Sequence, residues 1–89
     1  MDIKSWKIML AVDDYGSFTR VGAELGYTQS GITQMMKNLE KKVGFPLYIK
    51  DHHGITLTNE AKSLIPAIRT LLNADEVIHQ EIAALNGAQ

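Results

Sequence analysis

Two amphipathic segments separated by only two residues constrain the fold of this chain more than any other feature. Apolar residues recur at helical spacing over residues 17–25 and again over residues 28–43, with Gly26-Tyr27 between them. Each segment opens on a hydroxyl side chain suited to cap a helix, Ser17 or Thr28. The apolar stripes are Phe18, Val21 and Leu25, then Ile32, Met36, Leu39 and Val43. A short helix, a glycine-containing turn and a longer helix predict a helix-turn-helix.

The flanking segments complete a small, mainly α-helical fold. Residues 2–15 carry apolar side chains at helical spacing, which predicts a first helix. Helix-ending glycines are expected at Gly16, Gly26 and Gly44. Residues 47–49 and the apolar pair Ile55 and Leu57 then flank the turn-like residues 51–54, which predicts a two-stranded hairpin. The expected fold is therefore a winged helix-turn-helix with three helices and a two-stranded wing, followed by a long terminal helix.

Residues 58–85 predict a terminal helix that a chain of 89 residues is too small to cover. A helix of this length extends about 40 Å at about 1.5 Å per residue. Its apolar residues alternate spacings of three and four, Asp75 interrupts them, and Pro66 is expected to bend the helix. The outer half needs a partner, and another copy of the chain is the simplest one. The predicted dimerisation seam comprises Ala61, Leu64, Ile68, Leu71, Ile78, Ile82 and Leu85.

Composition excludes several classes of protein. The 89 residues suffice for one domain and leave no room for a barrel or a doubly wound sheet. The chain has no cysteine, which excludes a disulfide scaffold and a thiolate zinc site and favours the cytoplasm. No apolar run reaches about 18 residues, so we expect no membrane span. Phosphate-binding glycine loops, paired carboxylates and a nucleophile beside a histidine are not recognisable, and we expect no catalysis, cofactor or metal site.

The outer face of residues 28–43 carries the side chains best suited to contact DNA. Glutamine pairs bidentately with adenine, serine and threonine reach base edges or phosphates, and lysine neutralises phosphates. These side chains are Thr28, Gln29, Ser30, Thr33, Gln34 and Lys37. The alternative is an ordinary solvated face, although such a face more often carries Glu and Lys pairs. Residues 17–62 have a net charge of +2 and residues 63–89 one of -2, against -1 for the whole chain.

The predicted wing tip offers Lys50, His52 and His53. One interpretation is contact with the DNA backbone or minor groove, and the other is simple exposure to solvent. Metal binding by the two histidines is disfavoured for two reasons. Adjacent side chains on an extended turn are expected to point apart, and no third ligand follows at a suitable spacing.

Four runs of residues, taken together, are specific for one family, and the resemblance that they carry covers nearly the whole chain. They are Gly16-Ser17-Phe18-Thr19-Arg20, Leu25-x-Tyr27-Thr28-Gln29-Ser30-Gly31-Ile32-Thr33, Leu39-Glu40-x-x-Val43-Gly44-x-Pro46-Leu47-Tyr48 and Leu57-Thr58-x-x-Ala61. This pattern resembles the N-terminal domain of LysR-type transcriptional regulators. The resemblance implies a winged helix-turn-helix over residues 1–58. It also implies a dimerisation helix with the start of a linker over residues 59–89.

The resemblance further implies sequence-specific binding of double-stranded DNA as a homodimer in the bacterial cytoplasm, at the nucleoid. The third helix would enter the major groove, Thr19 and Arg20 would touch phosphates, and the wing would supply its three contacts. A small-molecule effector would act only through a larger C-terminal domain that is absent here. A winged-helix module that binds another protein, without nucleic acid, is the alternative.

The sequence departs from the usual family pattern at a few positions. Gln34 and Lys50 stand where arginine is frequent, and the change removes a bidentate contact to guanine or phosphate. Val21-Gly22 replaces a usual Ala-Ala, and Gly31 replaces a larger residue. A glycine within a helix costs about 0.5–1 kcal/mol relative to alanine. We therefore expect weaker DNA binding than is typical of the family.

Overall fold

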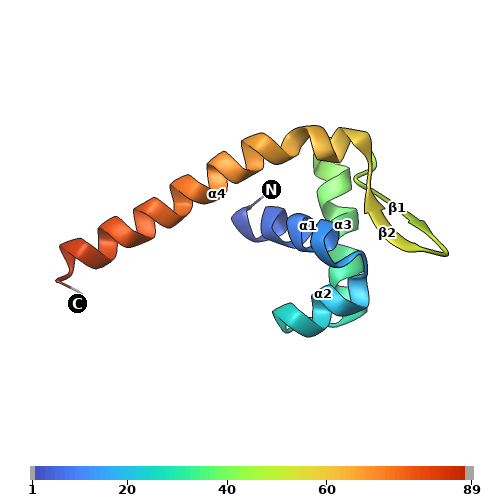
Figure 1. The fold of residues 1–89 in the computed structure, drawn as a ribbon, viewed down its shortest axis with the longest axis horizontal. Helices are drawn as coiled ribbons and strands as arrows, with labels where there is room; N and C mark the ends of the chain where they lie inside the picture. The colour runs from blue at the N-terminus through green and yellow to red at the C-terminus, as the bar shows by residue number, and fades with distance from the viewer. Residues whose placement is uncertain (1, 88–89) are drawn as a thin grey trace.

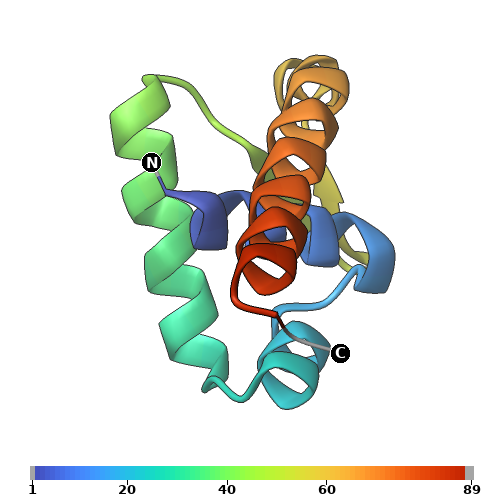
Figure 2. The ribbon, with the colours of Figure 1, turned by 90° about the vertical axis from the view of Figure 1, so that its left-hand side faces the viewer.

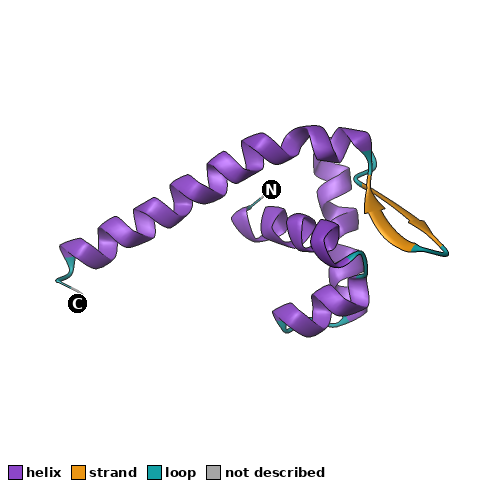
Figure 3. Cartoon of the chain, viewed as in Figure 1, coloured by secondary structure: helices purple, strands orange, loops and turns teal. Residues whose placement is uncertain are grey.

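The computed structural model describes residues 2–87, which form four helices and a small two-stranded hairpin that projects at one side of the molecule (Figures 1 and 3). The elements in chain order are α1 (Ile3–Tyr15), α2 (Phe18–Leu25), α3 (Gln29–Val43), β1 (Tyr48–Asp51), β2 (Gly54–Leu57) and α4 (Asn59–Leu85). Met1, Ala88 and Gln89, which the predicted domain boundaries include, lie outside the described residues. The predicted fold class is confirmed: three helices, a two-stranded antiparallel sheet and a long terminal helix.

The helix ends follow the capping signals in the sequence. The side chains of Ser17, Thr28 and Thr58 each accept a hydrogen bond from the backbone N–H three residues later, as expected of N-caps. Asp2, which the sequence interpretation did not single out, caps α1 by accepting from the N–H of Ser5 at 2.9 Å. The three helix-ending glycines are confirmed as left-handed C-caps.

Two glycines shape the turn between α2 and α3. Gly26 has φ +82°, and its N–H donates to the carbonyl of Gly22 at 2.9 Å. The N–H of Tyr27 donates to the same carbonyl at 2.8 Å. A Cβ on Gly22 would lie 2.6 Å from the Tyr27 carbonyl oxygen, so the absence of a side chain lets the turn fold back against α2. Gly22 therefore does more than weaken a helix, which was the role that helix propensity predicted for it.

The core lies where α1, α2 and α3 meet the inner face of the hairpin and the start of α4. The apolar stripe of α3 is confirmed, with Ile32, Met36 and Leu39 almost fully buried. Leu25 was expected to join the core from α2, but it is 45% exposed because α2 ends there and the turn leaves its side chain outside. In α1, Trp6, Ile8, Met9 and Val12 are buried.

The wing is tied to the helices by backbone hydrogen bonds. Strands β1 and β2 pair antiparallel, with Tyr48 opposite Leu57 and Lys50 opposite Ile55. The N–H of Ile55 donates to the carbonyl of Gly16, between α1 and α2, at 2.9 Å. On the other side, the carboxylate of Glu40 in α3 accepts from the N–H of Leu47 at 2.8 Å. The wing is therefore held at a fixed place beside α2 and α3.

Helix α4 leaves the rest of the molecule and projects far beyond it (Figure 1). It has 27 residues and continues through Pro66 as one helix. Figure 2 looks toward the free end of α4, which lies in front of the other helices. The first half of α4 packs on the core through Ala61 and Ile68. The molecule measures 50 × 26 × 20 Å, and the projecting half of α4 accounts for the long dimension.

Candidate nucleic-acid interface

The exposed face of α3 carries an internally hydrogen-bonded set of polar side chains at its N-terminal end. The side chain of Gln29 donates through Nε2 to Thr33 Oγ1 at 2.9 Å, and that hydroxyl donates to the backbone carbonyl of Gln29 at 3.1 Å. An amide nitrogen carries two N–H donors, so the first bond leaves one N–H and the side-chain oxygen Oε1 of Gln29 for a base edge. Thr28 Oγ1 caps the helix and lies 3.3 Å from Ser30 Oγ. The structure therefore brings Thr28, Gln29, Ser30 and Thr33 together.

A pair of hydrogen-bonded amide side chains lies further along the same helix. Gln34 donates through Nε2 to Asn38 Oδ1 at 2.9 Å, and both side chains are exposed. The sequence interpretation missed Asn38, although a partner four residues after Gln34 lies on the same side of a helix. Lys37 is exposed on the same helix, next to Asn38 in sequence.

Two cations of the expected DNA-contacting set lie over tyrosine rings from other elements. The ammonium nitrogen of Lys37 is 5.7 Å from the centroid of the Tyr48 ring in β1. Hydrogen bonding to the Tyr48 hydroxyl raises the pKa of Lys37 above its ordinary value, so the side chain is fully charged at neutral pH. Arg20 Cζ in α2 is 5.2 Å from the centroid of the Tyr15 ring at the end of α1. Cations at these distances are attracted to the ring face.

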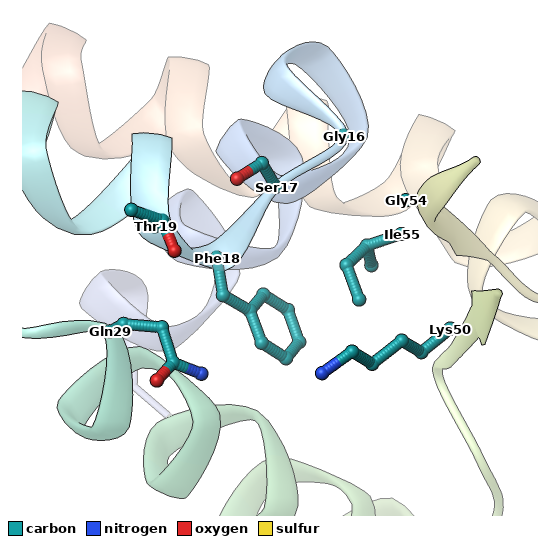
Figure 4. Close-up of a pocket in the computed structure, with 8 residues that line it drawn as sticks. All are labelled: Gly16, Ser17, Phe18, Thr19, Gln29, Lys50, Gly54 and Ile55. Carbon is teal, nitrogen blue, oxygen red and sulfur yellow. The ribbon is translucent and has the colours of Figure 1, made fainter. Parts of the chain in front are cut away.

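The sequence predicts Lys50 at the wing tip with the two histidines. In the structure Lys50 lies in strand β1, before the turn that carries them. It pairs with the buried Ile55, and directly opposed side chains in an antiparallel sheet share a face. Figure 4 shows its side chain reaching from the wing toward Gln29 and ending beside the ring of Phe18. These residues line a depression of about 150 Å³ together with Thr19, between the wing and the first turns of α2 and α3.

The two wing-tip histidines are exposed in the turn that joins β1 and β2. Their ring centroids lie 4.0 Å apart, so the expectation that adjacent side chains point apart is wrong here. The turn closes through Asp51, whose carboxylate accepts from the N–H of His53 at 2.8 Å. Within residues 2–87, no group of three or more His, Cys, Asp or Glu side chains is arranged to hold a metal ion.

The predicted dimerisation seam divides into a buried part and an exposed part. Ala61 and Ile68 are 0% and 4% exposed, because they pack into the core of their own chain and have almost no surface left for a partner. An apolar depression of about 160 Å³ lies beside them, lined by Trp6, Leu64, Ala67, Ile68 and Leu71. The projecting half of α4 exposes Val77, Ile78, Ile82 and Leu85.

Among the described residues, no helix is long and apolar enough to cross a membrane.

Fold and site together define a class of protein: a winged helix-turn-helix whose third helix presents a hydrogen-bonding face, extended by a long terminal helix. Residues 3–62 match the model of the bacterial regulatory helix-turn-helix proteins of the lysR family. The chain belongs to this family, and the resemblance found in the sequence is confirmed.

Relatives and solved structures agree with this assignment. The transcriptional regulator CzcR of Bacillus cereus is 32% identical over 78 residues, which cover 86% of this chain and 27% of that protein. The transcriptional activator CmpR of Synechocystis is 31% identical over 85 residues, or 96% of this chain and 28% of CmpR. The chain thus spans about a quarter of the length of these curated relatives.

Among solved structures, the DNA-binding domain of CbnR in complex with DNA superposes with a TM-score of 0.86 and 26% identity, covering 97% of this chain and 99% of that one. A LysR-family regulator, CbnR crystallised as a longer chain, superposes with a TM-score of 0.83 and 28% identity, covering 94% of this chain and 29% of that one. The relatives named here are transcription regulators, and none of these names describes an enzyme.

Proposed function

We propose that this chain is the DNA-binding module of a LysR-type transcription regulator and binds double-stranded DNA sequence-specifically as a dimer. The observation that carries the proposal is the exposed face of α3. It combines two hydrogen-bonded glutamines, Gln29 paired with the Thr33 hydroxyl and Gln34 paired with the Asn38 amide, with an adjacent lysine, instead of the Glu and Lys pairs of a solvated helix. A structure similar to this chain over almost its whole length, that of the CbnR DNA-binding domain, was solved in complex with DNA.

In this proposal the N-terminal half of α3 enters the major groove. Gln29 reads an adenine edge through its free N–H and its carbonyl oxygen, held in place by Thr33. Gln34 reads a second position, and Ser30 and Thr28 reach a neighbouring base or phosphate. Around this helix, phosphates are contacted by Thr19 and Arg20 from α2, by Lys37 from α3 and by Lys50 from the wing, with His52 and His53 at the wing tip.

The dimer forms through α4. Leu64 and Leu71 border the apolar depression, and Ile78, Ile82 and Leu85 lie exposed beyond it, so one partner helix can cover both regions. A second copy is the occupant because its own α4 offers an identical apolar row, and a two-fold axis satisfies both copies at once. Two copies of α3 then read the two halves of an interrupted palindrome.

The remaining parts of the proposal follow from this assignment. Residues 1–58 are the DNA-binding domain and residues 59–89 the dimerisation helix with the start of a linker. A small-molecule effector acts only through a further C-terminal domain. The chain works at the chromosome in the bacterial cytoplasm and catalyses no reaction.

Selection of bound duplexes from a random-sequence pool tests the proposal. We expect enrichment of an interrupted palindrome. The Gln29→Ala variant should lose about 1–3 kcal/mol of discrimination at one base pair in each half-site, with little change in its affinity for unrelated DNA. Gln80→Ala, an exposed glutamine on α4, is the matched control and should select the same sequence as the unmodified chain. A pool that enriches no sequence would contradict the proposal and favour a protein-binding module.

A further inference from the structure

Each of the three tyrosines in the chain carries a cation over its ring. The pairs, with the distance from the cation to the ring centroid, are Lys4 over Tyr27 at 5.0 Å, Arg20 over Tyr15 at 5.2 Å and Lys37 over Tyr48 at 5.7 Å. Two of these cations, Arg20 and Lys37, belong to the proposed DNA interface. Lys4, near the start of α1, does not, and it therefore provides an internal control.

The Tyr48 ring is fixed before any ligand binds. It is half-buried against the core, and the edge of the buried Phe18 ring meets it at a centroid distance of 4.9 Å and an interplanar angle of 74°. The backbone of Tyr48 is held in the wing by pairing with Leu57. One ring thus joins β1 to α2 and presents a face to Lys37 from α3.

Tyr15 occupies the corresponding place for α2. It is the last residue of α1, it packs against the core, and it is half-buried. Arg20 lies in the first turn of α2 and is exposed to solvent, and its guanidinium lies over the Tyr15 ring. Both cations therefore extend from one element and rest on an aromatic ring fixed in another.

A ring in this position lowers the cost of binding an anion. A long cationic side chain loses rotamer freedom when a phosphate immobilises it, and this loss opposes association. A cation that already rests on a ring has given up part of that freedom in the free protein. Its N–H groups on the side away from the ring remain available to phosphate oxygens.

We propose that Tyr15 and Tyr48 are positioning residues, which hold Arg20 and Lys37 in place for contact with DNA phosphates. This inference rests on the proposed function of the chain. It assigns to the two aromatic rings a role in affinity that is separate from their contribution to the core.

A double-mutant cycle on the whole 89-residue chain tests the role of Tyr48. The variants are Tyr48→Leu, Lys37→Met and the two combined, and the probe is the duplex enriched by the unmodified chain. Tyr48→Leu should weaken binding by about two- to ten-fold for each protomer that binds. In the Lys37→Met background, the same change should cost less than about two-fold, because the cation that the ring holds is gone. An equal loss in both backgrounds would mean a merely structural ring and would overturn the proposal.

Two further variants separate the ring from its hydroxyl and from general loss of charge. Tyr48→Phe keeps the ring face but removes the hydroxyl that hydrogen-bonds to Lys37, so it should lose less affinity than Tyr48→Leu. A loss as large as that of Tyr48→Leu would overturn the role of the ring face. Lys4→Met removes a cation that rests on a ring outside the interface and should change affinity by less than about two-fold. If Tyr48→Leu does not fold, the Tyr15→Leu and Arg20→Met cycle carries the same test.

A measurement without DNA distinguishes this proposal from the proposed function. Ring currents should shift the side-chain proton resonances of Lys37 upfield in the free protein, and Tyr48→Leu should abolish the shift. Unshifted Lys37 resonances would overturn the positioning role. If the unmodified chain binds the duplex but the cycles show no coupling, only the positioning role fails. If the unmodified chain binds no DNA while the resonances are shifted, the proposed function fails and the phosphate-positioning role falls with it.

Discussion

Replacing Thr58 with valine should loosen the junction between the wing and α4. The Thr58 hydroxyl donates to the carbonyl of Pro46 at 2.9 Å and accepts from the N–H of Ala61 at 3.1 Å. The side chain is only 8% exposed, so water cannot readily replace either partner. Valine has nearly the shape of threonine but carries a methyl group in place of the hydroxyl, and a methyl group neither donates nor accepts a hydrogen bond. The Thr58 backbone bond, from its N–H to the carbonyl of Leu47 at 3.0 Å, remains in the variant.

The expected cost combines two losses. Removing an N-cap side chain costs about 1 kcal/mol, and leaving a partly buried carbonyl without its donor costs about 1–3 kcal/mol. Together we expect Thr58→Val to lower the free energy of unfolding by about 2–4 kcal/mol. For a domain of this size each kcal/mol lowers the Tm by about 4–8 °C, so the Tm should fall by about 8 °C at least and by about 32 °C at most.

Urea unfolding followed by far-ultraviolet circular dichroism measures this cost. Protein concentration must be the same for every variant, because the proposed dimerisation would contribute to the apparent stability. Ser17→Ala is the matched control: Ser17 also caps a helix, but its bond to the N–H of Arg20 is exposed and 3.2 Å long, so we expect a loss of about 1 kcal/mol or less. A loss for Thr58→Val no larger than that of Ser17→Ala would refute the reasoning.

Three other predictions concern the turn, the dimer and the first helix. Gly22→Val should lower the free energy of unfolding by about 3 kcal/mol, because a Cβ would lie 2.6 Å from the Tyr27 carbonyl oxygen. Gly26→Ala has open space for its Cβ and should cost only about 1–2 kcal/mol, from the left-handed backbone; equal urea midpoints for the two variants would contradict this order. Ile82→Asp should sediment as a monomer, and an unchanged dimer would exclude the projecting half of α4 as the interface. The capping bonds from Ser5 lower the pKa of Asp2 below 3.8, so the stabilising contribution of this carboxylate is present above that pH and is lost as pH falls through the lowered pKa. Asp2→Ala should therefore make the free energy of unfolding less sensitive to acid. An unaltered pH profile of stability would argue against the cap.

The helices and the wing could be predicted from the sequence because their signals are local. Ser17, Thr28 and Thr58 begin helices through bonds to backbone groups three residues away, and the glycines end them within one residue. The face of α3 followed from periodicity alone, and its core stripe is buried as expected.

Features that depend on contacts between distant segments could not be predicted in this way. The tyrosines that carry Arg20 and Lys37 lie in other elements, and nothing in the local sequence marks them as partners. Lys50 was misplaced because its direction depends on which strand face meets the core. The role of Gly22 was misjudged because the constraint comes from the close approach of the turn, which helix propensity does not describe.

The salt dependence of DNA binding tests the central claim most directly. In the proposed function three cations in each protomer, Arg20, Lys37 and Lys50, contact phosphates, so a dimer should release about six condensed counterions. The logarithm of the association constant should then fall linearly with the logarithm of salt concentration, with a slope of about −5. The triple variant of these residues should flatten the slope, whereas Lys4→Met should leave it unchanged. An association constant independent of salt in the unmodified chain would contradict the account of this protein as a DNA-binding module.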